Sequence, residues 1–343
     1  MTKRLSIAVA ISFVFAMSCA NRATAPPARP GAASRPADLA ARLQRAARET
    51  TDPERAALLW WRIAELESST ARMTHDAAAL DEAVRSYRDV AARYPAFSRM
   101  DEVLFELATL EHDRGRREVA ARVWLAIACV EVVSDPAADE PAALDGSFDV
   151  ARCTARRARP AIVAHAWVVL GEDWFDEGKL AIAIAAYRRA VAIGAGRLPH
   201  LEPYVRFKLG WSLYRAERYV EAMDALAALL ATIGDRGGDL SRQAIERFAF
   251  CATEDDWDGD GAIDAQRGFD RPEVGHWLDT AVWWMPEAVL RMAEVYVAAS
   301  DVERAARAYE ELIARWPASP RAAASREALG RLGALRSPRR ARR

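Results

Sequence analysis

The feature of this sequence that most constrains its fold is a recurring pair of helical patterns in which small residues and aromatic rings keep fixed spacings. The clearest copy begins with Trp167, Leu170 and Gly171 and continues with Ala183 and Tyr187. Spacings of three and four residues place side chains on one face of a helix. The small residues let two helix backbones approach closely, and the rings fill the space beside them. The pattern therefore predicts pairs of packed helices.

Five copies of this pattern follow one another along the chain. Trp174 and Ala190 complete the clearest copy, and the first helix of the first copy is about two turns longer than the others. The other four copies contain Trp60, Ile63, Ala64, Ala83, Tyr87 and Pro95; Leu107, Ala108, Ala120 and Trp124; Leu209, Gly210, Ala222 and Leu226; and Met292, Ala293, Tyr296, Ala305, Tyr309 and Pro317. No stretch alternates apolar and polar residues as a strand does, so we predict an all-α fold built of internal repeats.

The five copies resemble tetratricopeptide repeats (TPRs), which are pairs of antiparallel helices. The resemblance implies an all-α, TPR-type helical-hairpin solenoid of five to six helix pairs over residues 39–333. Residues 240–253 and 272–284 have the spacing of one further, degenerate pair. In this family the concave face, which first helices mostly line, binds proteins or peptides. The polar residues that we expect on this face are Glu172, Asp173, Arg206 and Arg215.

The amino terminus has the pattern of an export signal. Two basic residues, Lys3 and Arg4, precede an apolar run from Leu5 to Met17. A run of this length fits a signal peptide and is too short to span a bilayer. Elsewhere no run approaches the roughly 18 apolar residues that a membrane helix needs. We therefore predict export, with no membrane-spanning helix after the signal.

Cys19 directly follows the apolar run, and the residues before it resemble a bacterial lipobox. The resemblance implies a lipoprotein signal peptide over residues 1–18 and lipid on Cys19, although Ala16 stands where leucine is usual. By lipoprotein sorting rules, Ala20 favours the outer membrane, with the protein facing the periplasm. The alternative is ordinary cleavage near Ala20 or Ala23, which would release a soluble periplasmic protein.

Charge and composition describe the segments on either side of the repeats. Residues 19–38 are rich in alanine and proline, and we predict a flexible tether there. The 48 basic and 49 acidic residues give a formal net charge of −1, and the only basic cluster is the tail, residues 334–343. Nucleic-acid binding needs clustered positive charge, and a terminal tail is usually a solvated end. We therefore expect no nucleic-acid partner, and contact with the membrane only through the lipid.

A long insertion, residues 134–160, replaces the short turn expected between the second and third helix pairs. Cys129 precedes it and Cys153 lies near its end. In an oxidising compartment these two residues could form a disulfide, and closing a loop of about 25 residues would stabilise the fold by roughly 3 kcal/mol. The alternative is two free thiols. Cys251 would then be an unpaired thiol buried in a helix.

An acidic loop, residues 254–271, carries carboxylates at alternate positions and resembles both the start of an EF-hand calcium loop and a thrombospondin type 3 repeat. The candidate calcium ligands are Asp256, Asp258, Asp260, the backbone carbonyl of Ala262, and Asp264. In such a loop Gly261 permits the sharp turn and Ile263 packs inward.

One position departs from the calcium-loop pattern. Arg267 stands at the twelfth position, where a bidentate carboxylate is usual, and it replaces up to two oxygens with a positive charge. Clustered carboxylates repel one another without a counter-ion. A bound Ca²⁺ and a solvated, turn-rich loop therefore remain the alternatives, and no other cofactor is expected.

Three segments in order, residues 94–108, 166–175 with 207–211, and 255–264, resemble TPR lipoproteins of myxobacteria, including those of the gliding-motility envelope machinery. The likeness covers roughly residues 50 to 320. It implies a non-enzymatic protein–protein interaction scaffold of the bacterial cell envelope, in a motility or outer-membrane assembly complex, whose partners are other envelope proteins. The alternative function is a calcium-stabilised or calcium-sensing TPR adaptor.

Enzymatic chemistry has no evident place in the sequence. The five histidines show no metal-ligand spacing, and neither a nucleophile motif nor a phosphate-binding loop occurs. No segment outside the repeats exceeds about 40 residues, which is less than a catalytic domain needs. We therefore predict that the protein is not an enzyme.

Overall fold

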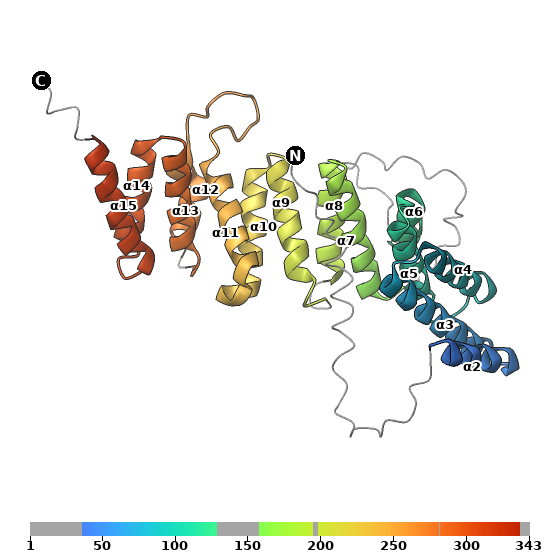
Figure 1. Cartoon of the computed structure of the whole chain (residues 1–343). Coiled ribbons are helices and arrows are strands. Elements are labelled where there is room, and N and C mark those ends of the chain that lie inside the picture. The colour runs from blue at the N-terminus through green and yellow to red at the C-terminus, as the bar shows by residue number, and fades with distance from the viewer. Residues whose placement is uncertain (1–35, 129–157, 195–197, 281, 337–343) are drawn as a thin grey trace, which may run out of the picture. The chain divides into compact units, whose positions relative to one another are not determined.

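The computed structural model describes residues 36–128, 158–194, 198–280 and 282–336, and every regular element within these ranges is a helix (Figure 1). The prediction of an all-α fold is confirmed. The chain divides into two compact units, one ending at Trp124 and the other beginning at Leu125. Among the described helices, none combines the length and apolar character needed to cross a membrane. Cys19, Cys129 and Cys153 lie outside the described residues.

The first unit contains long helices joined by short turns. Its helices are α2 (Pro36–Glu49), α3 (Pro53–Thr74), α4 (Ala77–Arg93), α5 (Met100–Asp113) and the first part of α6 (Arg117–Ala128). Two of them begin at an aspartate cap: Asp52 accepts the backbone N–H of Glu54 at 3.0 Å, and Asp76 accepts that of Ala78 at 2.9 Å. At 22 residues, α3 has the extra length expected of the first repeat.

Two helix boundaries and the burial of one tryptophan differ from the sequence predictions. Helix α2 begins at Pro36, so the last three residues of the predicted tether are helical, because proline suits a first helical turn and Asp38 favours it electrostatically. The last helix reaches Arg336, so the predicted tail also begins in a helix. In α3, Trp61 is the buried ring and Trp60 is only half-buried.

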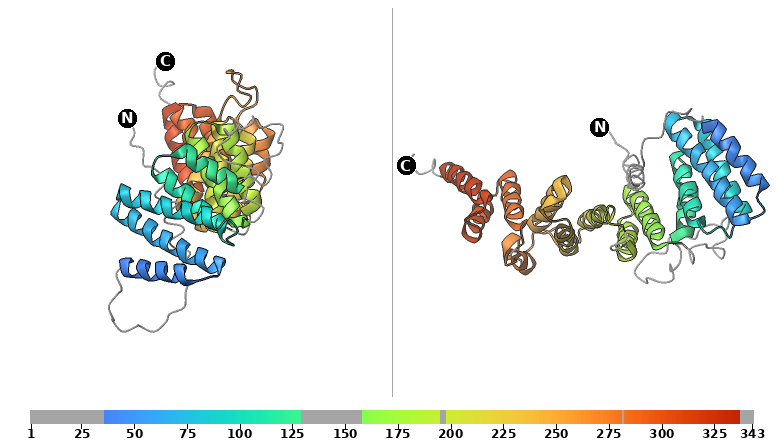
Figure 2. Two further views of the ribbon diagram at one scale, coloured as in Figure 1. Left: turned by 90° about the vertical axis from the view of Figure 1, so that its right-hand side faces the viewer. Right: turned by 90° about the horizontal axis from the view of Figure 1, so that it is seen from below.

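The second unit is a row of helix pairs, seen from two further directions in Figure 2. After the end of α6, its helices are α7 (Pro160–Asp176), α8 (Leu180–Gly194), α9 (Glu202–Arg215), α10 (Tyr219–Ile233), α11 (Gly238–Thr253), α12 (Pro272–Leu278), α13 (Met285–Ala298), α14 (Val302–Arg315) and α15 (Pro320–Arg336), with short 3₁₀ turns at η4 (Gly234–Gly237) and η5 (Gly268–Asp270). Apart from α12, each helix packs mainly on its neighbours in the row, as repeat proteins require, and α11 packs directly on α13.

Glycines in the first helices set how closely the pairs approach. A Cβ at Gly171 of α7 would lie 2.8 Å from the ring of Tyr187 in α8, and a Cβ at Gly210 of α9 would lie 2.7 Å from Leu226 in α10. Tyr187 and Leu226 are fully buried. The small–large packing predicted from the repeat pattern is therefore present in both pairs.

The predicted degenerate pair of helices is wrong in its second member. Helix α12 ends at Leu278 instead of reaching Trp284, because both the backbone N–H and the hydroxyl of Thr280 bond to the carbonyl of Trp277 and close the turn. Helix α11 packs against α10 and α13. Trp284 is 2% exposed, and its ring centroid lies 4.8 Å from that of Phe248 in α11.

Candidate functional site

The first helices α7 and α9 carry the four polar residues expected to bind partners, but Glu172 has a structural role. Its carboxylate accepts the Tyr187 hydroxyl at 2.5 Å and lies 2.8 Å from the ammonium of Lys208. Lys208 is only 3% exposed, and its Nζ stands 4.0 Å from the centroid of the Phe175 ring. Burial, and then this carboxylate, raise the pKa of the Tyr187 hydroxyl. The cluster joins α7, α8 and α9.

The other three predicted residues differ in exposure. Arg206 is partly buried and bonds Glu202 of its own helix at 2.8 Å, and Asp173 is partly buried. Arg215 is exposed, and its guanidinium carbon stands 4.7 Å from the centroid of Phe175. Arg215 is therefore the one of the four that offers an exposed charged group.

Arg247 of α11 was missed at the sequence level and stands among three aromatic rings. Its guanidinium carbon is 5.1 Å from the ring centroid of Trp211, 5.9 Å from that of Tyr214 and 5.5 Å from that of Phe250. The Trp211 ring in turn lies 5.5 Å from that of Phe175. We call the set Phe175, Trp211, Tyr214, Phe250, Arg215 and Arg247 the aromatic–arginine surface.

The acidic loop gathers three of its five predicted ligands. Carboxylate oxygens of Asp256, Asp258 and Asp260 lie within 4.8 Å of one another. Asp256 accepts the N–H groups of Gly259 and Gly261, both at 2.8 Å. Both glycines have positive φ, +73° and +81°, as the sharp turn requires. The backbone is thus folded around the three carboxylates.

The remaining predicted ligands are arranged differently. Asp264 accepts the backbone N–H of Trp257 at 2.9 Å and an N–H of Arg271 at 2.6 Å, so an arginine already binds this carboxylate. Ala262 lies in the exposed tip of the loop. The prediction that Ile263 packs inward is wrong: its side chain is 67% exposed.

Three arginines fasten the acidic loop to the helices: Arg271 at its end, and Arg304 and Arg307 of α14. Arg304 of α14 donates two hydrogen bonds to Asp255, the second at 3.0 Å, and lowers the pKa of that carboxyl. Arg307 bonds Asp270 at 2.7 Å. Arg271 is 3% exposed and lies with its guanidinium carbon 3.8 Å from the ring centroid of Trp257. These contacts hold the loop whether or not a cation binds.

The donor set fits a calcium ion only in part. Three clustered carboxylates offer oxygens of the kind that Ca²⁺ prefers, but the ion takes six to eight ligands. Asp264 is engaged by Arg271, and the guanidinium of Arg267 lies 3.9 Å from Asp255. Water and backbone carbonyls would have to complete the coordination.

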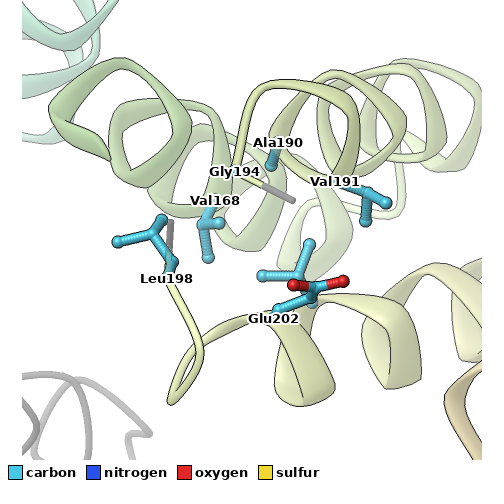
Figure 3. Close-up of a pocket in the computed structure, with 7 residues that line it drawn as sticks. Val168, Ala190, Val191, Gly194, Leu198 and Glu202 are labelled. Atoms are coloured by element: carbon cyan, nitrogen blue, oxygen red, sulfur yellow. The ribbon is translucent and has the colours of Figure 1, made fainter. Parts of the chain in front are cut away.

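Two reactive side chains and a pocket in the described part of the second unit show no catalytic arrangement. Burial lowers the pKa of His165 to about 4 and raises that of the Cys251 thiol. The pocket lies between α7, α8 and α9 and encloses about 190 Å³, part of it open to solvent (Figure 3). Its lining is mostly aliphatic and includes one charged residue, Glu202. The pocket is smaller than most small-molecule sites.

Comparison with known proteins identifies the repeats. The family model described as tetratricopeptide repeat matches residues 204–232 and 287–319, which lie in α9–α10 and α13–α14. No curated protein matches the chain. Similar solved structures include the C-terminal part of a TPR repeat-containing protein from Cytophaga hutchinsonii, with 13% identity, 84% of this chain and 94% of that chain covered, and a TM-score of 0.40. Apo RapI is 10% identical, with 82% of this chain and 69% of that chain covered and a TM-score of 0.42. The yeast Sti1 TPR2AB domain in complex with pHSP90 is 13% identical, with 79% of this chain and 97% of that chain covered and a TM-score of 0.26.

Proposed function

We propose that this chain is a non-enzymatic protein–protein interaction scaffold of the bacterial cell envelope. The observation that carries the proposal is the repeat architecture. Pairs such as α7–α8 and α9–α10 use their buried small and aromatic residues to pack on one another, while the first helices keep polar and aromatic groups at the surface. Tandem repeats of this kind present extended surfaces suited to proteins and peptides.

The non-enzymatic part of the proposal rests on the repeat architecture, in which the ionisable groups of the first helices α7 and α9 take part in packing. Lys208, which is buried, and Glu172, which is partly buried, are bound to each other. His165 is buried, and its lowered pKa keeps it neutral at physiological pH. Neither arrangement leaves a nucleophile beside an accessible base.

The envelope location rests on the sequence of the amino terminus. We propose that Cys19 carries a lipid, that residues 19–38 form most of the tether, and that the repeats face the periplasm from the outer membrane. The motility and outer-membrane assembly complexes of the resembled lipoproteins are where we propose to look for partners. A Cys19→Ala variant should move the protein from the membrane fraction to the soluble periplasmic fraction, whereas Cys251→Ala should leave it on the membrane.

A photo-crosslinking residue at a single position tests the scaffold role in cells. Placed at Arg215 on α9, it should capture a specific envelope protein. Placed at Arg188, which is exposed on the second helix α8, it should not give the same adduct. Equal adducts at both positions, or no specific adduct at Arg215 or any other first-helix position, would contradict the proposal.

A second candidate function is a calcium-stabilised or calcium-sensing adaptor. The grouping of oxygens from Asp256, Asp258 and Asp260 within 4.8 Å favours it. Because a ligand that binds only the native state must stabilise it, Ca²⁺ should raise the melting temperature relative to EDTA. Superimposable melting curves would exclude this function and would leave the scaffold proposal untouched.

A further inference from the structure

Two arginines of the aromatic–arginine surface differ from the arginines of the second unit that are paired with carboxylates. Arg206, Arg271 and Arg304 each bond a carboxylate. Within the described ranges, Arg215 and Arg247 form no ion pair, and their guanidinium groups contact rings: Phe175 for Arg215, and Trp211, Tyr214 and Phe250 for Arg247. Both therefore keep hydrogen-bond donors available.

A guanidinium that stacks on a ring is well prepared to bind a carboxylate. The ring contacts the flat face of the group and limits the freedom of the side chain. The N–H groups point outward in the plane of the guanidinium, in the fork that matches the two oxygens of a carboxylate. Less conformational entropy is then lost on binding than for a free arginine.

The two arginines lie over neighbouring rings. Arg215 stands on Phe175 and Arg247 on Trp211, and these two ring centroids are 5.5 Å apart. One extended segment can therefore reach both guanidinium groups. Two acidic side chains near this surface are already engaged, Glu172 by Lys208 and Glu254 by the Tyr214 hydroxyl at 3.3 Å.

We propose that this surface binds an extended acidic segment of a partner protein, with two carboxylates received by Arg215 and Arg247. The inference rests on the proposed function and names the partner chemistry that one face of the scaffold selects. Charge complementarity favours an anionic occupant, and the state of the rings favours a peptide over nucleic acid. The Phe175 ring already carries both Lys208 and Arg215, so it is not free to stack on a base.

Fluorescence anisotropy with the full-length protein tests the proposal. The probe is a labelled synthetic peptide in which glutamates alternate with apolar residues, and its control has every glutamate replaced by glutamine. The wild type should prefer the acidic peptide. Arg215→Gln and Arg247→Gln should each weaken its binding by about tenfold, because each removes a charged fork. The matched control is Arg242→Gln on α11, whose arginine is exposed and paired with Asp239.

Each outcome decides the inference. Equal affinity for the two peptides, or unchanged binding by both arginine variants, overturns it. Stronger binding of a single-stranded oligonucleotide than of the acidic peptide also overturns it. If Arg247→Lys still binds the acidic peptide as the wild type does, a positive charge at position 247 is sufficient. That result would contradict the proposal that the guanidinium group, held over the aromatic rings, binds a carboxylate through two N–H groups. If a partner is crosslinked in cells but is not displaced by the acidic peptide, the scaffold function stands and this inference fails.

Discussion

The ring of Tyr187 occupies the space that any side chain at position 171 would need. A Cβ at Gly171 would lie 2.8 Å from one ring carbon and 3.1 Å from two others. The ring cannot move aside easily, because it is fully buried and its hydroxyl bonds Glu172 at 2.5 Å. Contact between α7 and α8 therefore depends on the absence of one methyl group.

Gly171→Ala should lower the free energy of unfolding by about 1–3 kcal/mol, because overpacking forces the ring or the helix to shift. The control is Gly330→Ala in α15, where a Cβ would meet nothing within 4 Å. Alanine is the better helix former, so the control should be neutral or stabilising by up to about 1 kcal/mol. Urea denaturation followed by circular dichroism measures both, and equal effects would count against the packing account.

Lys208→Met should destabilise the second unit by about 3 kcal/mol, because it leaves the carboxylate of Glu172 buried without its cation. The double variant Lys208→Met with Glu172→Gln should recover much of the loss, since the amide is neutral and can still accept the Tyr187 hydroxyl. Chemical denaturation of the four proteins in this double-mutant cycle gives the coupling energy. Additive effects would show that the pair is not coupled.

Arg304→Met should destabilise the protein by about 1–2 kcal/mol at neutral pH, because it removes two charged hydrogen bonds to Asp255. These bonds hold the pKa of Asp255 below its ordinary value of 3.8. A carboxyl with a lowered folded pKa stabilises the protein above that value, and the benefit disappears as pH falls through the folded pKa. The gap between variant and wild type should therefore close in acid.

The matched control for that variant is Arg331→Met, which removes an exposed pair with Glu327 on α15. Such pairs contribute little, so its stability should stay within about 0.5 kcal/mol of the wild type across the pH range. Melting temperatures measured from pH 7 down to pH 3 provide the comparison. A gap for Arg304→Met that is constant with pH would assign its effect to packing instead of charge.

Arg267→Glu should tighten calcium binding by about tenfold, because a bidentate carboxylate at the twelfth loop position adds two oxygens and removes a positive charge. Asp256→Asn with Asp260→Asn should abolish it, while Asp239→Asn, outside the loop, should have no effect. Titration calorimetry with CaCl₂ measures the affinity of each variant. No heat from wild type or from Arg267→Glu would mean that the loop is not a calcium site.

The repeat pattern predicts the helix pairs because its signals are local. Gly171 and Tyr187, and likewise Gly210 and Leu226, lie in adjacent helices joined by a short turn, so their spacing in sequence determines their contact in space. The end of helix α12 was mispredicted because the apolar pattern does not reveal where the helix stops. Hydrogen bonds from the hydroxyl and the backbone N–H of Thr280 to the Trp277 carbonyl end the helix early. The apolar pattern nevertheless continues to Trp284, whose ring packs on Phe248 of α11.

The candidate site was less predictable because its contacts join residues far apart in sequence. The three clustered aspartates were visible from their spacing alone. The arginine that binds Asp255 comes from α14, 49 residues later, and nothing in the spacing distinguishes Arg304 from the other arginines. Arg247 gains its position only when α11 packs on α9 and brings its guanidinium to Trp211.

Direct packing of α11 on α13 gives the second unit two paths between these helices, one through side-chain contacts and one through the covalent chain. Residues 254–284, which follow the longer covalent path, carry little load while the contact holds. If tension along the row separates the two helices and breaks the ion pairs of Asp255 and Asp270, this segment can extend to a length of roughly 100 Å before the backbone tightens. The acidic loop and α12 would therefore let α11 and α13 move apart under tension while the other helix pairs stay folded.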